Sequence, residues 1–354
     1  MKERRMNSCD IDVKDFRAEY DKCSTYLKKI VGASEQYTSV VMTGEGMLGL
    51  WGSLHSCLAS HGGNRVFVAT NGFFGDCFYE MACAKAQQVS VYRAPWNVAL
   101  NGAAILAAMD AAGGSFDVVL MVMVETPSGI HNTEAMKAVG QFLASTPTVF
   151  IVDCVSGMGG MDIDAEKNGV DIVLGGSQKV LALPPSLSIL CVSPKAWRRI
   201  SACAYEGYDA LSPFSGKDFP YTMDWGLIAA LSCEAVQLAQ TEECLAQSIL
   251  LRYEAAKHFR NGLTKLGVSL YVMNDSDMAN TVTVANIPSC FSSWDELNAA
   301  LRKCGMMVGS SWGALQGKVF RVGHMSRSQC KLQNVNRLLD AIASAITEKQ
   351  KKSS

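Results

Sequence analysis

The chain has 354 residues, of which 49% are hydrophobic and 18% charged, and its formal net charge is −1 at pH 7. This amount of apolar material is enough for a large core and for two domains. A nearly neutral chain without a basic stripe is a poor partner for nucleic acid or for an anionic membrane, so small molecules are the expected ligands.

Cysteine usage and the apolar runs give expectations about compartment and metals. The longest apolar run, Val118 to Val124, is too short to span a bilayer, and the basic start of the chain is not followed by the apolar stretch of a signal peptide. We therefore expect a cytoplasmic protein. The 13 cysteines form no Cys-x-x-Cys pair and the five histidines lack zinc-ligand spacing, so we expect reduced thiols and no metal site.

The region from Ser39 to Val192 alternates short β-branched runs with longer amphipathic stretches. Helical patterns occur at 48–60 and 135–144, and nearly continuous apolar strands are indicated at 39–42, 66–70, 89–92, 118–124, 148–153, 172–175 and 188–192. This order predicts a mostly parallel, seven-stranded α/β sheet covered by helices on both faces. Ligands of such sheets bind beyond the carboxyl ends of the strands.

The pattern changes after Trp225, where it is helical for about forty residues. Short strands at 269–272, 281–285 and 318–322 and helices at 294–303 and 328–347 then indicate a smaller C-terminal α/β domain. We place the boundary so that residues 1–235 form the large domain and residues 236–354 the small one.

Lys179 follows the small residues of Gly175-Gly176-Ser177 and precedes an apolar segment. An apolar pocket lowers the pKa of a lysine, and the neutral amine is the form that attacks a carbonyl group. A surface lysine on a turn is the alternative, but such a lysine usually has polar neighbours.

Asp153 ends a predicted buried strand upstream of Lys179. An aspartate at such a strand end, followed by a lysine after small residues, is the arrangement by which proteins hold pyridoxal phosphate. The aspartate would keep the pyridine nitrogen protonated and the lysine would form an imine. Asp153 could equally cap the next helix, and both roles are compatible.

A glycine-rich turn, Thr43 to Gly49, follows the first strand and opens a helix, so its amides could cradle a phosphate. Glu45 opposes this interpretation because a carboxylate repels a phosphate dianion. Glu45 must therefore turn away, be protonated, or meet something other than phosphate.

Three further residues have both a functional and a structural interpretation. Arg321 interrupts an apolar strand, where it could snorkel to the surface or offer a bidentate fork to a carboxylate. Phe74 could stack on a heterocycle or belong to the core. Thr126 could bond the ring's phenolic oxygen or cap a turn.

Taken together, the segments Val152-Asp153-Cys154-Val155-Ser156, Gly176-Ser177-Gln178-Lys179 and Arg321-Val322-Gly323-His324-Met325 resemble the class V aminotransferases of pyridoxal-phosphate fold type I. This group includes the alanine–glyoxylate and serine–pyruvate aminotransferases, and the resemblance covers roughly residues 15–346.

The resemblance implies a transaminase that moves an amino group from a small amino acid to a 2-oxo acid such as glyoxylate or pyruvate. Lys179 would be the Schiff-base lysine and proton shuttle, and Asp153 would lie under the pyridine nitrogen. Phe74 would stack on the ring, Thr126 would bond its phenolic oxygen, and Arg321 would clamp the substrate carboxylate.

The phosphate would be held by Gln178 and by the turn at Gly46 and Met47. Thr222 matches the position that contacts the phosphate of the neighbouring subunit, which implies a homodimer with shared active sites. The resemblance implies that the chain starts after the N-terminal arm that members of the family usually carry.

Three alternatives remain open. The turn around Glu45 and Met47 is similar to the branch that contains pyridoxamine–pyruvate aminotransferase, although Trp312 stands where that branch has a second arginine. Transamination of 2-aminoethylphosphonate with pyruvate is another possibility. A catalytically impaired binding protein with the same fold is the non-enzymatic alternative.

Overall fold

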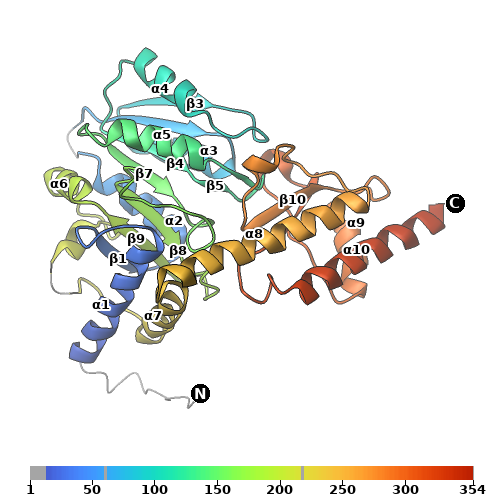
Figure 1. Cartoon of the computed structure of the whole chain (residues 1–354). Coiled ribbons are helices and arrows are strands. Elements are labelled where there is room, and N and C mark those ends of the chain that lie inside the picture. The colour runs from blue at the N-terminus through green and yellow to red at the C-terminus, as the bar shows by residue number, and fades with distance from the viewer. Residues whose placement is uncertain (1–12, 60–61, 217–218, 354) are drawn as a thin grey trace.

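A computed structural model describes residues 13–59, 62–216 and 219–353, and its larger part is built on one seven-stranded sheet (Figure 1). The strand order is β1-β9-β8-β7-β4-β2-β3. The strands are β1 Thr38–Thr43, β2 Arg65–Thr70, β3 Gln88–Arg93, β4 Val118–Val122, β7 Val149–Asp153, β8 Ile172–Gly176 and β9 Leu187–Val192. Only β9 runs against its neighbours, so the predicted mostly parallel sheet is confirmed.

The apolar run that begins at Val118 is shorter as a strand than we expected. After β4 the chain forms a separate two-residue strand, β5 Val124–Glu125, which pairs antiparallel with β6 Ile130–His131. The amide of Met123 bonds the carbonyl of Asp153 at 2.9 Å, and the chain then leaves the main sheet. This departure carries Glu125 and Thr126 toward the carboxyl edge.

Helices cover both faces of the main sheet, and alternate strand residues face opposite layers. Val118, Leu120 and Val122 pack with α2 Gly46–Ser56, α3 Phe73–Lys85 and α6 Pro194–Cys203. Val119 and Met121 belong to the opposite core, which also contains residues of α1 Val13–Ile30, α4 Gly102–Ala111, α5 Thr133–Leu143 and α7 Trp225–Ala239. Because both faces are buried, the strands read as continuous apolar runs.

The C-terminal part has a small sheet and a core of its own. Helix α8 Glu242–Lys265 extends from the larger part to this sheet, as Figure 1 shows. There β10 Val282–Asn286 pairs antiparallel with β11 Val319–Gly323, and α9 Trp294–Lys303 and α10 Leu332–Ser353 complete the layers. Phe259, Phe320 and Ile342 lie in this core.

The predicted strand at 269–272 does not form. Hydrogen bonds from Tyr271 to Val284 and from Asn286 to Ser269 hold this segment beside β10, but only one isolated bridge, between Leu270 and Ala285, results. The segment is therefore a loop, in which Val272 is buried with Ile130 and Met278 while Leu270 and Tyr271 are partly buried. The boundary between residues 235 and 236 falls inside α7 and stays a prediction.

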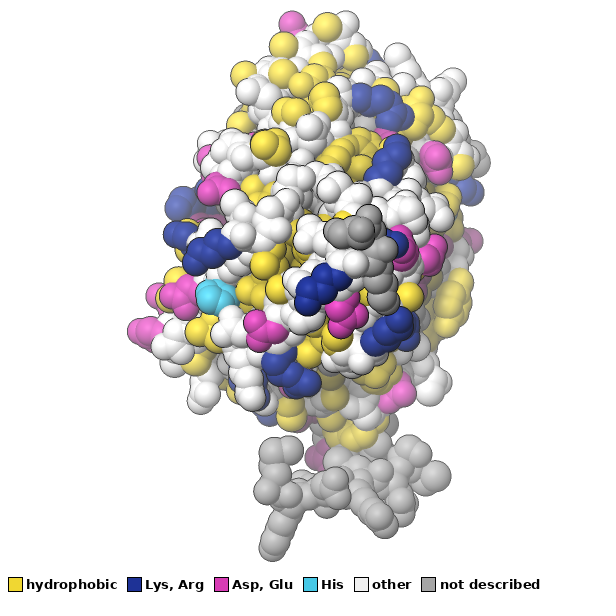
Figure 2. Space-filling view, turned by 90° about the vertical axis from the view of Figure 1, so that its right-hand side faces the viewer, with side chains coloured by type: hydrophobic (Ala, Val, Ile, Leu, Met, Phe, Trp, Pro, Cys, Tyr) yellow, Lys and Arg dark blue, Asp and Glu magenta, His cyan; other side chains and the backbone are white. Residues whose placement is uncertain are grey.

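The face that carries α9 and α10 mixes charges of both signs with apolar side chains, as Figure 2 shows. Among the described residues, no helix combines the length and the apolar character that a bilayer span requires.

Candidate active site

The carboxyl ends of the parallel strands meet at a cavity of about 180 Å³. Residues from six separate segments line it: Glu45, Gly46, Met47, Leu50, Phe74, Val124, Thr126, Asp153, Val155, Ser156, Gln178, Lys179 and Trp312. Eight of the ten predicted site residues are among them, and Thr222 and Arg321 are not. A larger hollow of about 990 Å³ lies where α7 meets α8, but none of the predicted site residues lines it.

Asp153 is the last residue of β7, and its side chain is only 6% exposed. Burial raises the pKa of Asp153 to about 6, although a hydrogen bond from the Val155 amide and the charge of Lys179 act in the opposite direction. The Val155 amide donates to Oδ1 at 2.8 Å. A carboxylate with one engaged oxygen is thus held at the floor of the cavity.

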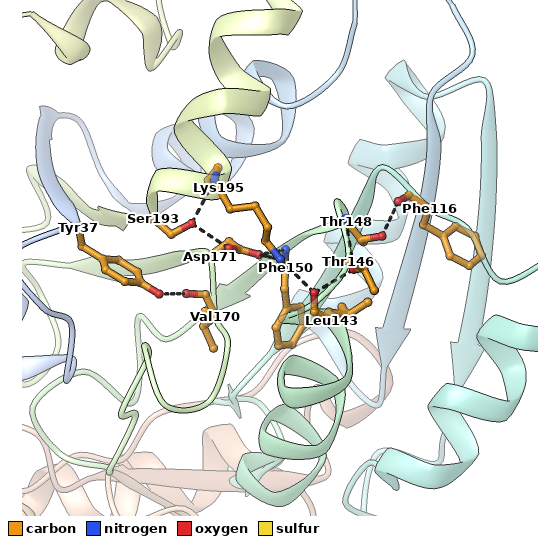
Figure 3. A network of polar contacts seen from close by, with 11 residues as sticks. Tyr37, Phe116, Leu143, Thr146, Thr148, Phe150, Val170, Asp171, Ser193 and Lys195 are labelled. Carbon is orange, nitrogen blue, oxygen red and sulfur yellow. Dashed lines mark hydrogen bonds and ion pairs between the residues drawn. The ribbon is translucent and has the colours of Figure 1, made fainter.

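Asp153 differs from the other buried aspartate of this sheet, Asp171, which lies at the opposite end of β8. Lys195 pairs with Asp171 at 2.8 Å, Ser193 donates to it at 2.8 Å, and the Phe150 amide donates to it at 2.9 Å (Figure 3). Asp171 is therefore fully engaged in linking β7, β8 and α6. Asp153 has no such set of partners.

Lys179 lies three residues after the end of β8, in the turn before β9. Burial lowers its pKa, the Asp153 carboxylate opposes this change, and the Arg321 guanidinium adds to it. The neutral amine is therefore more accessible near neutral pH than it is for an exposed lysine. This is the state that a nucleophilic or proton-accepting lysine needs.

The start of α2 is the expected phosphate turn, and Glu45 caps it. The Met47 amide donates a hydrogen bond to Glu45 Oε2 at 2.9 Å. One of the amides that we expected to bind a phosphate is therefore already hydrogen-bonded to a carboxylate. Gly49 lets α2 lie against the sheet, since a Cβ atom there would come within 2.5 Å of Leu174. The Glu45 carboxylate thus lies on its own helix at the edge of the cavity, and which of the three predicted outcomes it follows stays a prediction.

The cavity contains an unsatisfied polar group at this end. Among the described residues, the buried Oε1 atom of Gln178 has no hydrogen-bond partner. The oxygen and nitrogen of a side-chain amide are told apart by their hydrogen-bond partners. If the Gln178 amide is rotated by about 180°, its NH₂ group takes the place of Oε1 and offers a hydrogen-bond donor to the cavity. The cavity therefore suits pyridoxal phosphate, with a carboxylate for the ring nitrogen, a lysine for the aldehyde and an amide near the phosphate.

Thr126 and Phe74 line the sides of the cavity. Thr126 Oγ1 and Ser156 Oγ are 2.7 Å apart, so this hydroxyl already has one partner. Phe74 lies in the first turn of α3, and its ring meets the ring of Trp312 edge to face at 5.8 Å.

Arg321 on β11 lies behind Trp312. Its guanidinium is 4.1 Å from the centre of the Trp312 ring, and its Nε donates to the carbonyl of Ser310. Burial lowers the pKa of Arg321 to about 10. Arg321 is thus near enough to influence Lys179, but it does not line the cavity, whereas the Trp312 ring that it contacts does.

Thr222 is exposed and lines a different hollow, together with Thr43 and Leu48 at the start of α2. The role predicted for Thr222 concerns a neighbouring subunit, and one chain leaves that role a prediction.

Sequence reasoning missed Ser156 and Trp312 as residues that line the cavity. Ser156 stands three positions after Asp153, in the turn that leaves β7, and this proximity could have indicated it. Trp312 comes from the C-terminal part of the chain, and only the resemblance pointed to its position, as the place where a related branch has a second arginine.

Comparison with known proteins agrees with this geometry. The family model described as aminotransferase class-V matches residues 14–212, which is more than half of the chain. The L-aspartate–glyoxylate aminotransferase of Paracoccus denitrificans is 29% identical over 271 residues, which cover 74% of this chain and 67% of the relative. The pyridoxamine–pyruvate transaminase of Mesorhizobium japonicum is 28% identical over 325 residues, which cover 88% and 79%.

A solved structure shares the fold over nearly the whole chain. The pyridoxamine–pyruvate aminotransferase of Mesorhizobium loti superposes with a TM-score of 0.88 at 26% identity, covering 98% of this chain and 88% of that chain. The family match and the fold together identify the chain as a pyridoxal-phosphate-dependent transaminase of the aminotransferase class-V family.

Proposed function

We propose that this transaminase moves the amino group of a small amino acid to a 2-oxo acid, glyoxylate or pyruvate, with Lys179 as the group that carries the proton. The observation that supports this most is that Lys179 and Asp153 line one cavity with Phe74, Thr126 and Gln178. The names of the similar proteins from Paracoccus and Mesorhizobium indicate glyoxylate and pyruvate as acceptors.

Pyridoxal phosphate, when bound, supplies an electron sink for the electron pair that remains when the substrate carbon loses its proton. The chain's own part begins with Lys179, whose burial favours the neutral amine. Its Nζ would bond the cofactor aldehyde in the resting enzyme. The same Nζ would accept the proton of the substrate α-carbon when it is not bonded to the cofactor.

The remaining residues would hold the reacting groups in place. Asp153 would hold the proton on the ring nitrogen through the carboxylate oxygen that Val155 does not engage. Phe74 would lie against the ring, and Thr126 would donate to the ring oxygen while Ser156 fixes its hydroxyl. Gln178 would form a hydrogen bond to the phosphate through its side-chain amide, whose buried Oε1 position has no partner among the described residues.

Substrate binding and assembly complete the proposal. Arg321 would bind the substrate carboxylate from behind Trp312, which requires the indole ring to shift or to share the pocket. We also propose a cytoplasmic homodimer in which Thr222 and the Gly46–Met47 turn of the two chains share the phosphate. The exposure of Thr222 supports this assembly.

A second candidate function is transamination of pyridoxamine with pyruvate, the reaction named for the two Mesorhizobium proteins. The observation that favours it is the Glu45 carboxylate on the Met47 amide, because this puts negative charge where a phosphate would sit. A vitamin without a phosphate would avoid that repulsion.

One pair of assays separates the two candidates. Purified protein is given pyridoxamine or pyridoxamine phosphate together with pyruvate, and alanine is measured. In parallel, protein loaded with pyridoxal phosphate is given a panel of amino acids together with glyoxylate. Tight retention of the phosphorylated cofactor and turnover of an amino acid support the first candidate. Rapid turnover of free pyridoxamine supports the second and would contradict the first.

A further inference from the structure

Glu125 is a buried carboxylate beside the cavity that none of the proposed chemical steps uses. It is the second residue of β5, immediately before Thr126, and it has no exposed surface. The described residues provide it with no ion-pair partner. Burying a carboxyl group without a cation costs free energy unless hydrogen bonds compensate for the lost water. The hydrogen-bond partners of Glu125 therefore show what it does in the fold.

Both carboxylate oxygens bind the first turn of α3. Oε1 accepts from the Gly75 amide at 2.7 Å, and Oε2 accepts from the Phe74 amide at 3.2 Å. These amides are at the positive end of a 13-residue helix, which compensates a negative charge. Glu125 thus caps a helix that begins about fifty residues earlier in the chain.

The turn before α3 is shaped to admit this carboxylate. A Cβ atom on Gly72 would lie 2.4 Å from the carboxyl carbon of Glu125, so any larger residue would displace the side chain. Gly72 is also the N-cap residue of α3, and it has no side chain with which to cap the helix itself. Glu125 therefore caps α3 in place of the side chain that Gly72 lacks.

The hydrogen bonds between Glu125 and the first turn of α3 join two walls of the cavity. Phe74 is bound through its own backbone amide, and Thr126 is covalently attached to Glu125. Both Phe74 and Thr126 line the cavity with Lys179 and Asp153. A shift of α3 relative to β5 would therefore change the gap between the ring of Phe74 and the hydroxyl of Thr126.

We propose that Glu125 is a positioning residue, which fixes Phe74 against the cofactor ring and keeps Phe74 and Thr126 in register. This inference rests on the proposed placement of the ring between these residues. Burial raises the pKa of Glu125 to about 8, while the two amides act against this rise. The positive end of α3 thus favours the ionised form without fully offsetting burial, and the two hydrogen bonds to the Phe74 and Gly75 amides hold Glu125 in place.

The direct test measures the affinity of purified apoprotein for pyridoxal phosphate in wild type and in Glu125→Gln. The amide keeps the shape of the side chain but offers only one oxygen, and its NH₂ group faces an N–H group. We expect the dissociation constant of the cofactor to rise about tenfold or more, because one of the two hydrogen bonds is lost and a buried backbone amide of α3 is left without a partner.

A double-mutant cycle with Phe74→Ala tests whether Glu125 acts on cofactor binding through Phe74. If Glu125 acts through Phe74, Glu125→Gln should weaken binding much less in the Phe74→Ala background than in the wild type. Additive effects of the two substitutions on the dissociation constant would overturn the proposal. Glu125→Asp, which keeps the carboxyl group but is one methylene shorter, serves in the cycle if Glu125→Gln does not fold.

Asp171→Asn is the matched control, because Asp171 is also a buried carboxylate that accepts a backbone amide, at the far end of β8 (Figure 3). It should lower the unfolding midpoint in urea and leave cofactor affinity unchanged. If wild-type protein binds the cofactor and Glu125→Gln binds it equally well, the positioning role is refuted and the transaminase proposal stands. If wild-type protein does not bind the cofactor, the proposed function itself fails.

Discussion

Substitution of Asp153 by asparagine should make the apoprotein more stable while nearly abolishing catalysis. Burial raises the pKa of Asp153 to about 6, above its ordinary value of 3.8. Between these two pH values the folded state binds more protons than the unfolded state, so the free energy of unfolding falls as pH rises. The ionised carboxylate therefore costs the apoprotein about 3 kcal/mol above pH 6.

Asparagine removes this cost because it carries no charge, and its carbonyl oxygen can still accept the Val155 amide. It cannot hold a proton on the ring nitrogen, so turnover should fall at least about a hundredfold, which corresponds to roughly 3 kcal/mol of lost transition-state stabilisation. Urea unfolding of both apoproteins at pH 4 and pH 7 measures the stability. The variant should gain stability at pH 7 and little at pH 4. A variant that is less stable at pH 7, or that turns over within a few fold of wild type, would refute this reasoning.

Three other substitutions test separate parts of the structure. Lys179→Arg should abolish turnover and covalent cofactor binding, because a guanidinium stays protonated, and residual turnover within tenfold of wild type would exclude Lys179 as the proton carrier. Arg321→Lys should raise KM for the amino acid about five- to thirtyfold with a smaller effect on kcat, because an ammonium group cannot bind the substrate carboxylate through two parallel hydrogen bonds; an unchanged KM would argue against Arg321 as the clamp. Gly140→Ala should lower the free energy of unfolding by about 2 kcal/mol, since a Cβ atom would lie 1.9 Å from the carbonyl oxygen of Asn168, and an unchanged urea midpoint would contradict that packing.

The main sheet could be predicted because its strands are buried on both faces and therefore read as continuous apolar runs. The segment at 269–272 has a similar local pattern but forms only one bridge, between Leu270 and Ala285. Strand formation there depends on the partner backbone of β10, which a local pattern does not encode.

The centre of the site could be predicted for a related reason. Asp153 and Lys179 follow neighbouring parallel strands, whose carboxyl ends must meet at one edge. Trp312 and Arg321 come from the C-terminal part, and their position depends on how that part packs against the main sheet. The role of Glu125 could not be predicted from the sequence because its partners, the amides of Phe74 and Gly75, lie about fifty residues away in the chain.

The central claim is that the amine of Lys179 forms the covalent bond with the cofactor, and peptide mass spectrometry tests it directly. Protein loaded with pyridoxal phosphate is reduced with borohydride and digested, and the modified lysine is located. We predict one modified residue, Lys179, and no modification in the Lys179→Arg variant. A label on another lysine, or reduced protein without a label, would contradict the account.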